Sequence, residues 1–301
     1  HRVCWHIFVN RKLLWLSRLM IILLSCMHTV HGESSATKNL SLTGVNLSVR
    51  VLLQGPYDTN SGLMSGQLQV KSLLPVVQPY SVEPFSYTGN EQLSADVLAA
   101  SDQDAVVDWM LLELRNIGTQ GAVVAQKAVV LQRDGDLVDA TTGEAALNFA
   151  TVSAGNYQVS IKHRNHQGVV TVSPSYLSVE VALVDFSSPT TQVQGEHARV
   201  TVDGFALLRG GDANQDGRLV AVGVGNDSNP LLSGVLLAGG NAGFNASFQQ
   251  QGYLLTDFNL DGRAVYSGPS NDNNLLLTNV LIHPGNVGFS ANFIVGSGVD
   301  P

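Results

Sequence analysis

The stretch Asp212-Ala-Asn-Gln-Asp-Gly-Arg218 returns 45 residues later as Asp257-Phe-Asn-Leu-Asp-Gly-Arg263. We call these stretches loop 1 and loop 2. In each loop, oxygen-bearing side chains occupy alternate positions, and a glycine follows that lets the backbone turn sharply around a cation. This is the spacing of the first half of an EF-hand calcium loop, in which the seventh residue adds its backbone carbonyl. Two copies at a fixed interval indicate calcium binding rather than two ordinary Asp-Gly turns.

The same period extends beyond the loops and defines a repeated unit. The matching segments are Asn226-Asp227 and Asn271-Asp272, Leu231-Leu232 and Leu276-Leu277, Gly240-Asn241 and Gly285-Asn286, Gly243-Phe244 and Gly288-Phe289, and Phe248 and Phe293. Each unit has a calcium loop, a short extended piece, an Asn-Asp turn and a short helix. The pair Asn229-Pro230 predicts the start of the first helix, because asparagine caps well and proline suits the first helical position. We expect residues 203–301, the repeat region, to hold two such repeats.

The loops depart from a standard calcium loop at the twelfth position. An EF-hand loop carries a bidentate glutamate there and a dockerin loop an aspartate, whereas Gly223 and Gly268 stand here. A later residue must then complete the ligand set, and the best candidates are Asp227 and Asp272. Oxygen ligands that include a carbonyl favour calcium over magnesium. The hypothesis therefore assigns Ca2+ to Asp212, Asn214, Asp216, Asp227 and the carbonyl of Arg218, and to Asp257, Asn259, Asp261, Asp272 and the carbonyl of Arg263.

Short runs of alternating apolar and polar residues fill residues 42–186, which we call the sheet region. A clear example is Tyr157-Gln-Val-Ser-Ile-Lys-His163, followed by a turn at 165–168. About seven or more such runs with turns between them predict a mainly β fold, an antiparallel β-sandwich of immunoglobulin-like type. Trp109 stands in an apolar run and is expected in the core. Residues 187–202 begin with a polar, turn-rich stretch and are interpreted as a linker.

The first 32 residues differ from the rest of the chain. Basic residues and no acidic one accompany an apolar run at 19–24. Because this run is too short to span a bilayer, residues 1–32 are interpreted as a secretory signal peptide rather than a membrane segment. Residues 23–26 also resemble a bacterial lipoprotein box, which leaves a lipid anchor at Cys26 as an alternative. The expected location is outside the cell, secreted or at the cell surface.

The composition agrees with an exported, calcium-stabilised protein. Both cysteines, Cys4 and Cys26, lie in the leader, so the mature chain has no disulfide unless Cys26 remains. Bound calcium is one way to stabilise such a chain. The formal net charge is −8 before the basic leader is removed. An acidic balance disfavours nucleic acid and anionic membranes as partners and suits divalent cations.

Residues outside the loops provide little catalytic signal. The sequence has no G-x-S-x-G, no H-E-x-x-H, no phosphate-binding glycine loop and no cysteine nucleophile in the mature part. We therefore predict that the chain is not an enzyme. Paired carboxylates for glycoside hydrolysis stay open as a third alternative. His163 and His166 alone do not make a zinc site, so a packed hairpin end is favoured, and Asp134-Gly-Asp136 is interpreted as a hairpin turn.

An ordered series of short motifs resembles the C-terminal modules of large secreted bacterial surface proteins, often labelled haemagglutinin-like or adhesin-like. The series comprises residues 49–58, 62–64, 107–115, 131–136, 155–157, 163–168, 211–217 and 225–227. The resemblance implies an extracellular β-sandwich followed by dockerin-like calcium repeats, without assigned catalytic residues. A true dockerin pairs each loop with a longer helix and ends the loop in aspartate.

Two functional hypotheses follow. The first is a non-enzymatic, calcium-binding structural module for adhesion, with an extracellular protein or polysaccharide as partner. The alternative is an accessory component of extracellular polysaccharide-binding or -degrading machinery, in which the repeats dock onto a cohesin-type protein. Both hypotheses place the chain outside the cell and need calcium in the loops.

Overall fold

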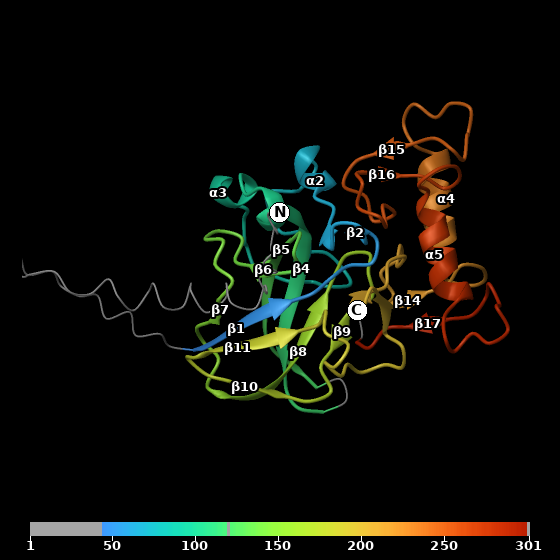
Figure 1. The fold of residues 1–301 in the computed structure, drawn as a ribbon. Coiled ribbons are helices and arrows are strands. Elements are labelled where there is room, and N and C mark those ends of the chain that lie inside the picture. Colours follow the sequence, from blue (N-terminus) through green and yellow to red (C-terminus); the bar gives the residue numbers. More distant parts are fainter. Residues whose placement is uncertain (1–43, 119–120, 300–301) are drawn as a thin grey trace, which may run out of the picture. The chain divides into compact units, whose positions relative to one another are not determined.

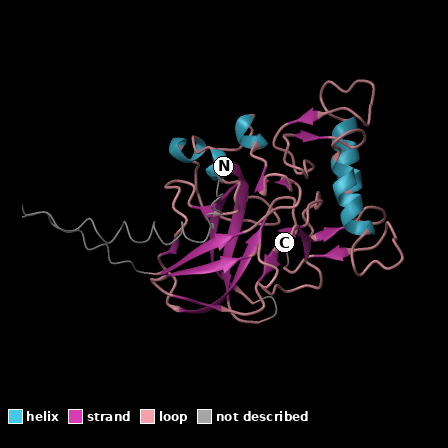
Figure 2. Ribbon diagram, in the orientation of Figure 1, coloured by secondary structure: helices cyan, strands magenta, loops and turns pink. Residues whose placement is uncertain are grey.

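The computed structural model describes residues 44–118 and 121–299 (Figure 1). The predicted signal peptide and Cys26 lie outside these residues. All of these described residues belong to one compact unit. The fold is mainly β, with several antiparallel sheets (Figure 2), as the alternation predicted. Within 44–118 and 121–299, no helix is long and apolar enough to cross a membrane.

The larger sheet has the strand order β10-β8-β4-β5-β6, and β9 also pairs with β8. Every residue of β4 is buried, because other parts of the chain cover both of its faces. Trp109 lies in the core as expected, and its indole N–H donates to the carbonyl of Pro75 (2.9 Å). The strands are β4 (Val106–Arg115), β5 (Val123–Gln132), β6 (Leu137–Val138), β8 (Gly155–Lys162), β9 (Val169–Val170) and β10 (Ser175–Leu177).

The smaller sheet consists of β1 (Val45–Arg50), β7 (Leu147–Phe149) and β11 (Val181–Asp185), in the order β11-β1-β7. β1 and β7 are antiparallel, but β1 and β11 are parallel, which departs from a purely antiparallel fold. The alternation in β11 is compatible with either direction, because side chains alternate in both kinds of strand. Apolar residues of both sheets belong to one continuous core.

The chain between β1 and β4 covers part of the larger sheet. Leu68 of α2 is fully buried, and the Tyr80 hydroxyl donates to the carbonyl of Trp109 (2.7 Å). The side chain of Gln69 contacts the carbonyls of Leu98 and Ala100 and the N–H of Val106. The elements here are β2 (Tyr57–Asp58), β3 (Leu63–Met64), α2 (Gln67–Val70), α3 (Ala95–Leu98) and η2 (Asp102–Asp104).

The repeat region begins with a hairpin and continues with two interdigitated units. β14, which begins at the end of loop 1, pairs with β17 at the end of the second unit. β16, which begins at the end of loop 2, pairs with β15 at the end of the first unit. Helices α4 and α5 lie side by side (Figure 1). The elements are β12 (Arg199–Val202), β13 (Phe205–Leu208), β14 (Arg218–Leu219), α4 (Ser228–Leu236), β15 (Gln250–Gln251), β16 (Arg263–Ala264), α5 (Asp272–Leu281) and β17 (Val295–Gly296).

The crossed strand pairing gives the two units a shared core. Leu219, Leu231 and Val235 of the first unit pack in one cluster with Phe258, Ala264, Leu276, Val280 and Val295. Each short strand needs a partner from the other unit for its backbone hydrogen bonds. We infer that neither unit forms this structure alone.

The prediction that Asn229 caps the first helix is wrong. α4 begins at Ser228, and the side-chain oxygen of Asn226 accepts a hydrogen bond from the N–H of Asn229 (2.9 Å). The side chain of Asn271 makes the equivalent bond to the N–H of Asn274 (2.9 Å). The asparagine of each Asn-Asp pair thus satisfies a helix N–H, which leaves the aspartate free for another contact.

Residues 187–202, which the sequence suggests as a linker, pack against the sheet region. Ser187 is buried and donates from its hydroxyl to Asp185 (2.6 Å). Val193 forms a bridge with Thr171 beside β9. The last residues of this range belong to β12.

Candidate metal centre

Loop 1 follows β13 and folds around the carboxylate of Asp212. One Asp212 oxygen accepts a hydrogen bond from the N–H of Asp216 (3.2 Å), and the other accepts from the N–H of Gly217 (3.0 Å). The side-chain oxygen of Asn214 also accepts from the N–H of Asp216 (3.0 Å). The Asp216 carboxylate accepts from the N–H of Arg218 (2.9 Å). These bonds bring the three predicted side chains of loop 1 into one tight turn.

Loop 2 repeats this hydrogen-bond pattern. The Asp257 carboxylate accepts from the N–H groups of Asp261 (3.1 Å) and Gly262 (2.8 Å). The side-chain oxygen of Asn259 accepts from the N–H of Asp261 (2.9 Å). The carboxylate of Asp261 differs from its counterpart, because it forms an ion pair with the guanidinium of Arg263 (2.6 Å).

The backbone of both loops takes the same course. Gly217 and Gly262 have φ angles of 75° and 83°, a left-handed conformation that glycine adopts at no steric cost. The fourth residues, Gln215 and Leu260, also have positive φ angles, 61° and 55°. The two loops therefore have the same left-handed conformation at their fourth and sixth residues.

Asp227 ties the two ends of loop 1 together. One of its oxygens accepts from the N–H groups of Ala213 (2.8 Å) and Asn214 (3.3 Å), and the other accepts from the N–H of Val220 (2.9 Å). A carboxylate oxygen has two acceptor positions, so the first oxygen is fully used. Asp227 is thus chiefly a hydrogen-bond anchor, and at most its second oxygen is left for a cation.

Asp272 makes the same contacts in loop 2. Its carboxylate accepts from the N–H groups of Phe258 (2.8 Å), Asn259 (3.3 Å) and Val265 (2.9 Å). Like Asp227, it is fully buried. The two residues chosen as ligands at the sequence level therefore lie at the loops and hold the loop backbones.

The loops concentrate buried negative charge. Burial, together with the neighbouring carboxylates of Asp227 and Asp216, raises the pKa of Asp212 to about 8. Burial raises the pKa of Asp227 to about 7 against the effect of its three backbone hydrogen bonds. In loop 2, burial raises the pKa of Asp257 to about 7, and burial with the charge of Asp257 raises that of Asp272 to about 8. A bound cation would offset this repulsion.

The surroundings of the two loops differ. In loop 1, Asn214, Asp216 and Arg218 are exposed. In loop 2, the corresponding residues are partly covered, and the ammonium of Lys71 donates to the carbonyl of Asp261. The positive charge of Arg164 also acts on Asp257. Loop 2 therefore already has basic side chains beside its carboxylates.

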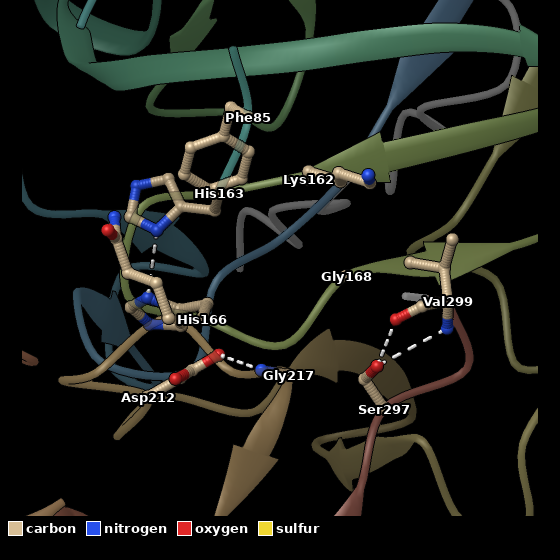
Figure 3. Close-up of a pocket in the computed structure, with 10 residues that line it drawn as sticks. Phe85, Lys162, His163, His166, Gly168, Asp212, Gly217, Ser297 and Val299 are labelled. Atoms are coloured by element: carbon tan, nitrogen blue, oxygen red, sulfur yellow. Dashed lines mark hydrogen bonds between the residues drawn. The ribbon is translucent and has the colours of Figure 1, made fainter. Parts of the chain in front are cut away.

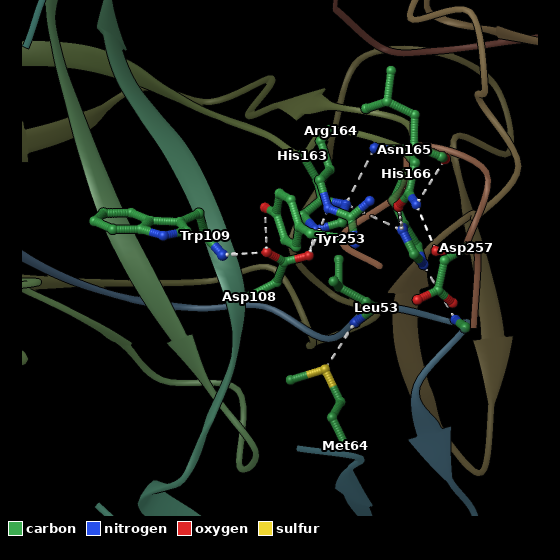
Figure 4. Close-up of polar contacts among 12 residues, drawn as sticks. Leu53, Met64, Asp108, Trp109, His163, Arg164, Asn165, His166, Tyr253 and Asp257 are labelled. Atoms are coloured by element: carbon green, nitrogen blue, oxygen red, sulfur yellow. Dashed lines mark hydrogen bonds and ion pairs between the residues drawn. The ribbon is translucent and has the colours of Figure 1, made fainter. Parts of the chain in front are cut away.

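Residues 163–168 connect the sheet region to both loops, which the sequence did not indicate. The side chain of Asn165 donates to the carbonyl of Asp257 (2.7 Å), and its backbone carbonyl accepts from the N–H of Asp212 (3.2 Å), as Figure 4 shows in part. The side chain of Gln167 donates to the carbonyls of Gly217 (3.2 Å) and Val295 (2.9 Å). The run of polar residues in this segment could have indicated such contacts, because amide side chains that are buried need hydrogen-bond partners.

The two histidines of this segment are buried parts of the junction. His163 contacts Asp108 through Nε2 (3.2 Å), and His166 contacts the side-chain oxygen of Asn165 through Nδ1 (2.8 Å) (Figure 4). Nε2 of His166 accepts from the N–H of Gly55 (3.2 Å). Burial lowers the pKa of both imidazoles. Because these contacts occupy their ring nitrogens, the histidines provide no arrangement for zinc.

Asp108 is the centre of a buried polar cluster. Its carboxylate contacts the guanidinium of Arg164 (2.9 Å) and accepts from the hydroxyl of Tyr253 (2.6 Å). Arg164 also lies over the ring of Tyr253, 4.1 Å from its centroid. Burial opposes ionisation of Asp108, but Arg164 and the hydrogen bonds from His163 and Tyr253 hold its pKa well below the ordinary value. This cluster joins β4 to the chain segment that leads into loop 2.

A small pocket lies between loop 1 and residues 163–168. Its volume is about 20 Å³, and Figure 3 shows His166, Asp212 and Gly217 along its wall. This space suits a single water molecule rather than an organic ligand. It belongs to the junction and does not make a separate binding site.

The donor set of both loops fits calcium in kind. All of the assigned groups offer oxygen, from carboxylates, amides or backbone carbonyls, and calcium prefers such ligands. Among residues 44–118 and 121–299, no three histidine, cysteine or acidic side chains are gathered so that they could hold a metal by themselves. A calcium site here would therefore also need Asn214 or Asn259 and backbone carbonyls, as the hypothesis assigns.

Comparisons of the chain with protein-family models, with curated proteins and with solved structures find no match. The function must therefore be argued from the loops and their surroundings.

Proposed function

We propose that the chain is a secreted or surface-exposed structural module for adhesion, in which loops 1 and 2 bind calcium. The observation that carries the proposal is the repeated turn around Asp212 and Asp257. In each turn, burial and a neighbouring carboxylate raise the pKa of an aspartate: Asp227 acts on Asp212, and Asp257 acts on Asp272. Such repulsion destabilises a folded protein unless a cation or protons balance it. Calcium is the cation that suits a flexible set of oxygen ligands.

The proposed role of calcium is structural. Loop 1 contacts the sheet region through Gln215, which donates to the carbonyl of Arg164 (3.1 Å). Loop 2 contacts it through Leu260, whose buried side chain belongs to the core of the sheet region. A cation that rigidifies either loop would therefore stabilise the fold through binding linkage. The sandwich and dockerin-like interpretations of the two regions are part of this proposal.

We also propose that the chain has no enzymatic activity. The polar cluster with the residue types of a catalytic site contains Asp108, His163 and Tyr253. Asp108 and His163 are buried, and their polar atoms contact one another and neighbouring backbone groups. A general base must reach its substrate, and this arrangement serves packing instead.

Calorimetric titration of the full chain with calcium tests the proposal. We expect two binding sites and a rise in melting temperature, because a ligand at 100 times its Kd stabilises the folded state by about 2.7 kcal/mol per site. Asp216→Ala and Asp261→Ala should each remove one site. Asp58→Ala is the matched control, since Asp58 is an exposed aspartate at the end of β2, outside the loops, and its carboxylate accepts from the N–H of Asn60. The absence of binding heat and of any calcium-dependent change in melting temperature would refute the proposal.

A second candidate function is calcium-dependent docking of an extracellular protein. It is favoured by apolar side chains that are exposed at equivalent positions of both units: Leu237 and Ile282, and Phe244 and Phe289. Both phenylalanines also have positive φ angles, 50° and 51°. A panel of cohesin-type receptors would be tested with calcium and with chelator. Docking predicts binding that needs calcium and is lost in the Phe244→Ala, Phe289→Ala double variant, but not in Val70→Ala, which changes an exposed apolar residue of the sheet region.

A further inference from the structure

Asn165 contacts the first residue of both loops. Its backbone carbonyl accepts hydrogen bonds from the N–H groups of Gly211 (3.0 Å) and Asp212 (3.2 Å), at the start of loop 1. Its side-chain amide donates to the carbonyls of Leu255 (3.0 Å) and Asp257 (2.7 Å), at the start of loop 2. One residue of the sheet region therefore holds the beginning of each loop, although the two loops are separate in sequence.

Asn165 is firmly held. It is fully buried, and its side-chain oxygen contacts Nδ1 of His166 (2.8 Å), while its N–H donates to Nδ1 of His163 (3.4 Å). Every polar group of Asn165 thus has a partner. Because all of its groups are buried and paired, any displacement of Asn165 would leave some of them unpaired. A displacement of the Asn165 carbonyl, which contacts loop 1, would therefore also disturb the Asn165 side-chain amide, which contacts loop 2.

We propose that Asn165 couples the two loops, so that a cation bound in one loop raises the affinity of the other. The proposal rests on the proposed calcium binding. A cation in loop 1 would fix the backbone at Asp212 and with it the carbonyl of Asn165. The ordered side chain of Asn165 would then hold the backbone of Asp257, whose carboxylate is assigned to the second cation. Binding of the first ion therefore already reduces the conformational entropy of the second loop, so that the second ion binds with a smaller entropy loss.

The experiment measures calcium affinity in the full chain and in variants with one loop blocked. Asp216→Ala leaves only loop 2, and Asp261→Ala leaves only loop 1. We expect each single loop to bind calcium at least about fivefold more weakly than the same loop does when the other is filled. Linkage requires the two factors to be equal. If each loop binds calcium with the same affinity whether the other loop is filled or blocked, the coupling is refuted. This outcome requires no variant of Asn165.

The role of Asn165 itself is tested with Asn165→Ala in both backgrounds. We expect the two loops to become independent, with a remaining factor below about two. The matched control is Asn241→Ala, because the buried side chain of Asn241 also donates to two backbone carbonyls, those of Val235 (2.8 Å) and Asn245 (3.0 Å). The control should lose stability but keep the coupling.

The outcomes separate this inference from the proposed function. If calcium binds at two sites but Asn165→Ala and Asn241→Ala keep the same coupling factor, Asn165 is not the connection and the inference is wrong. If the unchanged chain binds no calcium, the proposed function fails and the inference fails with it. If Asn165→Ala does not fold, hydrogen exchange of the Gly262 amide tests the coupling between the loops instead. Calcium added to Asp261→Ala should slow this exchange through the filled loop 1, and an unchanged rate would refute the coupling.

Discussion

Loop 1 and loop 2 have nearly the same internal structure but different neighbours. In both, the first carboxylate accepts two backbone N–H groups of its own loop, and the later aspartate accepts three. Loop 1 is open to solvent at Asn214 and Asp216. Loop 2 is partly covered and lies beside Lys71, Arg164 and Arg263. The repeated residues therefore determine the turn, while its electrostatic environment depends on Lys71 and Arg164, far away in sequence, and on whether the arginine of the loop pairs with its own carboxylate.

A consequence for calcium follows from this difference. Positive charges close to a carboxylate stabilise its ionised form and compete with a cation for the same oxygens. In loop 1, Arg218 is exposed, and the carboxylate of Asp216 accepts hydrogen bonds only from backbone and amide groups among the described contacts. No positive side chain of this turn is therefore paired with a loop 1 carboxylate among those contacts. We therefore expect loop 1 to be the tighter calcium site.

The largest predicted effect concerns the closer packing of loop 2. A Cβ atom at Gly55 would lie 1.8 Å from the carbonyl oxygen of Phe258 and 3.0 Å from Cα of Asn259. Gly55→Ala must displace the backbone of loop 2, and we expect a loss of about 3 kcal/mol in the free energy of unfolding. Urea denaturation would measure this loss, together with weaker calcium binding at loop 2 and a smaller change at loop 1.

Gly234→Ala provides the control for Gly55→Ala. Gly234 lies inside α4, and a Cβ there would meet only the Gln250 side chain at an ordinary distance of 3.5 Å. Alanine is favoured over glycine within a helix by about 0.5–1 kcal/mol. This variant should therefore be equally or more stable than the unchanged chain. Equal behaviour of both glycine variants would contradict the packing argument.

The second prediction tests the equivalence of the anchors. Asp227→Asn and Asp272→Asn each replace one carboxylate oxygen by an NH2 group, which cannot accept the backbone N–H groups. We expect each variant to lose about 2 kcal/mol of stability, which is the usual cost of leaving a buried backbone N–H without an acceptor. The two losses should be similar, since the three distances match. Thermal unfolding of both variants in the same buffer would show a difference if the loops were not equivalent.

Local features of this fold could be predicted from sequence, while long-range ones could not. The alternation at 157–163 predicts β8, and the repeated residues predict the shared turn of the two loops. The parallel pairing of β1 with β11 was missed, because alternation does not encode strand direction. The role of Asn165 was also missed, since its side chain contacts Asp257, 92 residues away. Asp227 lies at loop 1, and its hydrogen bonds to the backbone were not predicted, because they join it to residues 7 to 14 positions away.

The third prediction concerns the pH dependence of the junction between the loops. Burial lowers the pKa of His163 and His166, while Arg164 lowers and Asp108 raises both values. A histidine with a lowered folded pKa contributes stability that is complete above its unfolded pKa and is lost as pH falls toward the folded pKa. Each histidine should remove up to about 1.4 kcal/mol of stability per pH unit below about pH 6.5, while the loop aspartates, whose pKa burial raises to about 7 or 8, act in the opposite direction.

The His166→Gln variant isolates one of these protons. Glutamine has an oxygen that can accept the Gly55 N–H in place of Nε2, but it does not titrate. The slope of unfolding free energy against pH between about pH 5 and pH 6.5 should therefore be smaller than in the unchanged chain. Carboxylates in the loops titrate in both proteins and cancel in the difference. Parallel slopes would show that folding does not lower the pKa of His166.

The smallest predicted effect tests the electrostatic difference between the loops directly. Arg263→Gln removes the ion pair with Asp261 (2.6 Å), which competes with a cation in loop 2. In the Asp216→Ala background, where loop 2 is the remaining site, calcium should bind more tightly by about 1 kcal/mol, the upper range for a partly exposed ion pair. Arg218→Gln in the Asp261→Ala background is the matched control for loop 1. Because Arg218 is exposed and its side chain has no described ion pair, this control should change the affinity less. If both arginine variants raised affinity equally, long-range charge rather than the Asp261 ion pair would distinguish the loops, and the ranking of loop 1 above loop 2 would then depend on Lys71 and Arg164 alone.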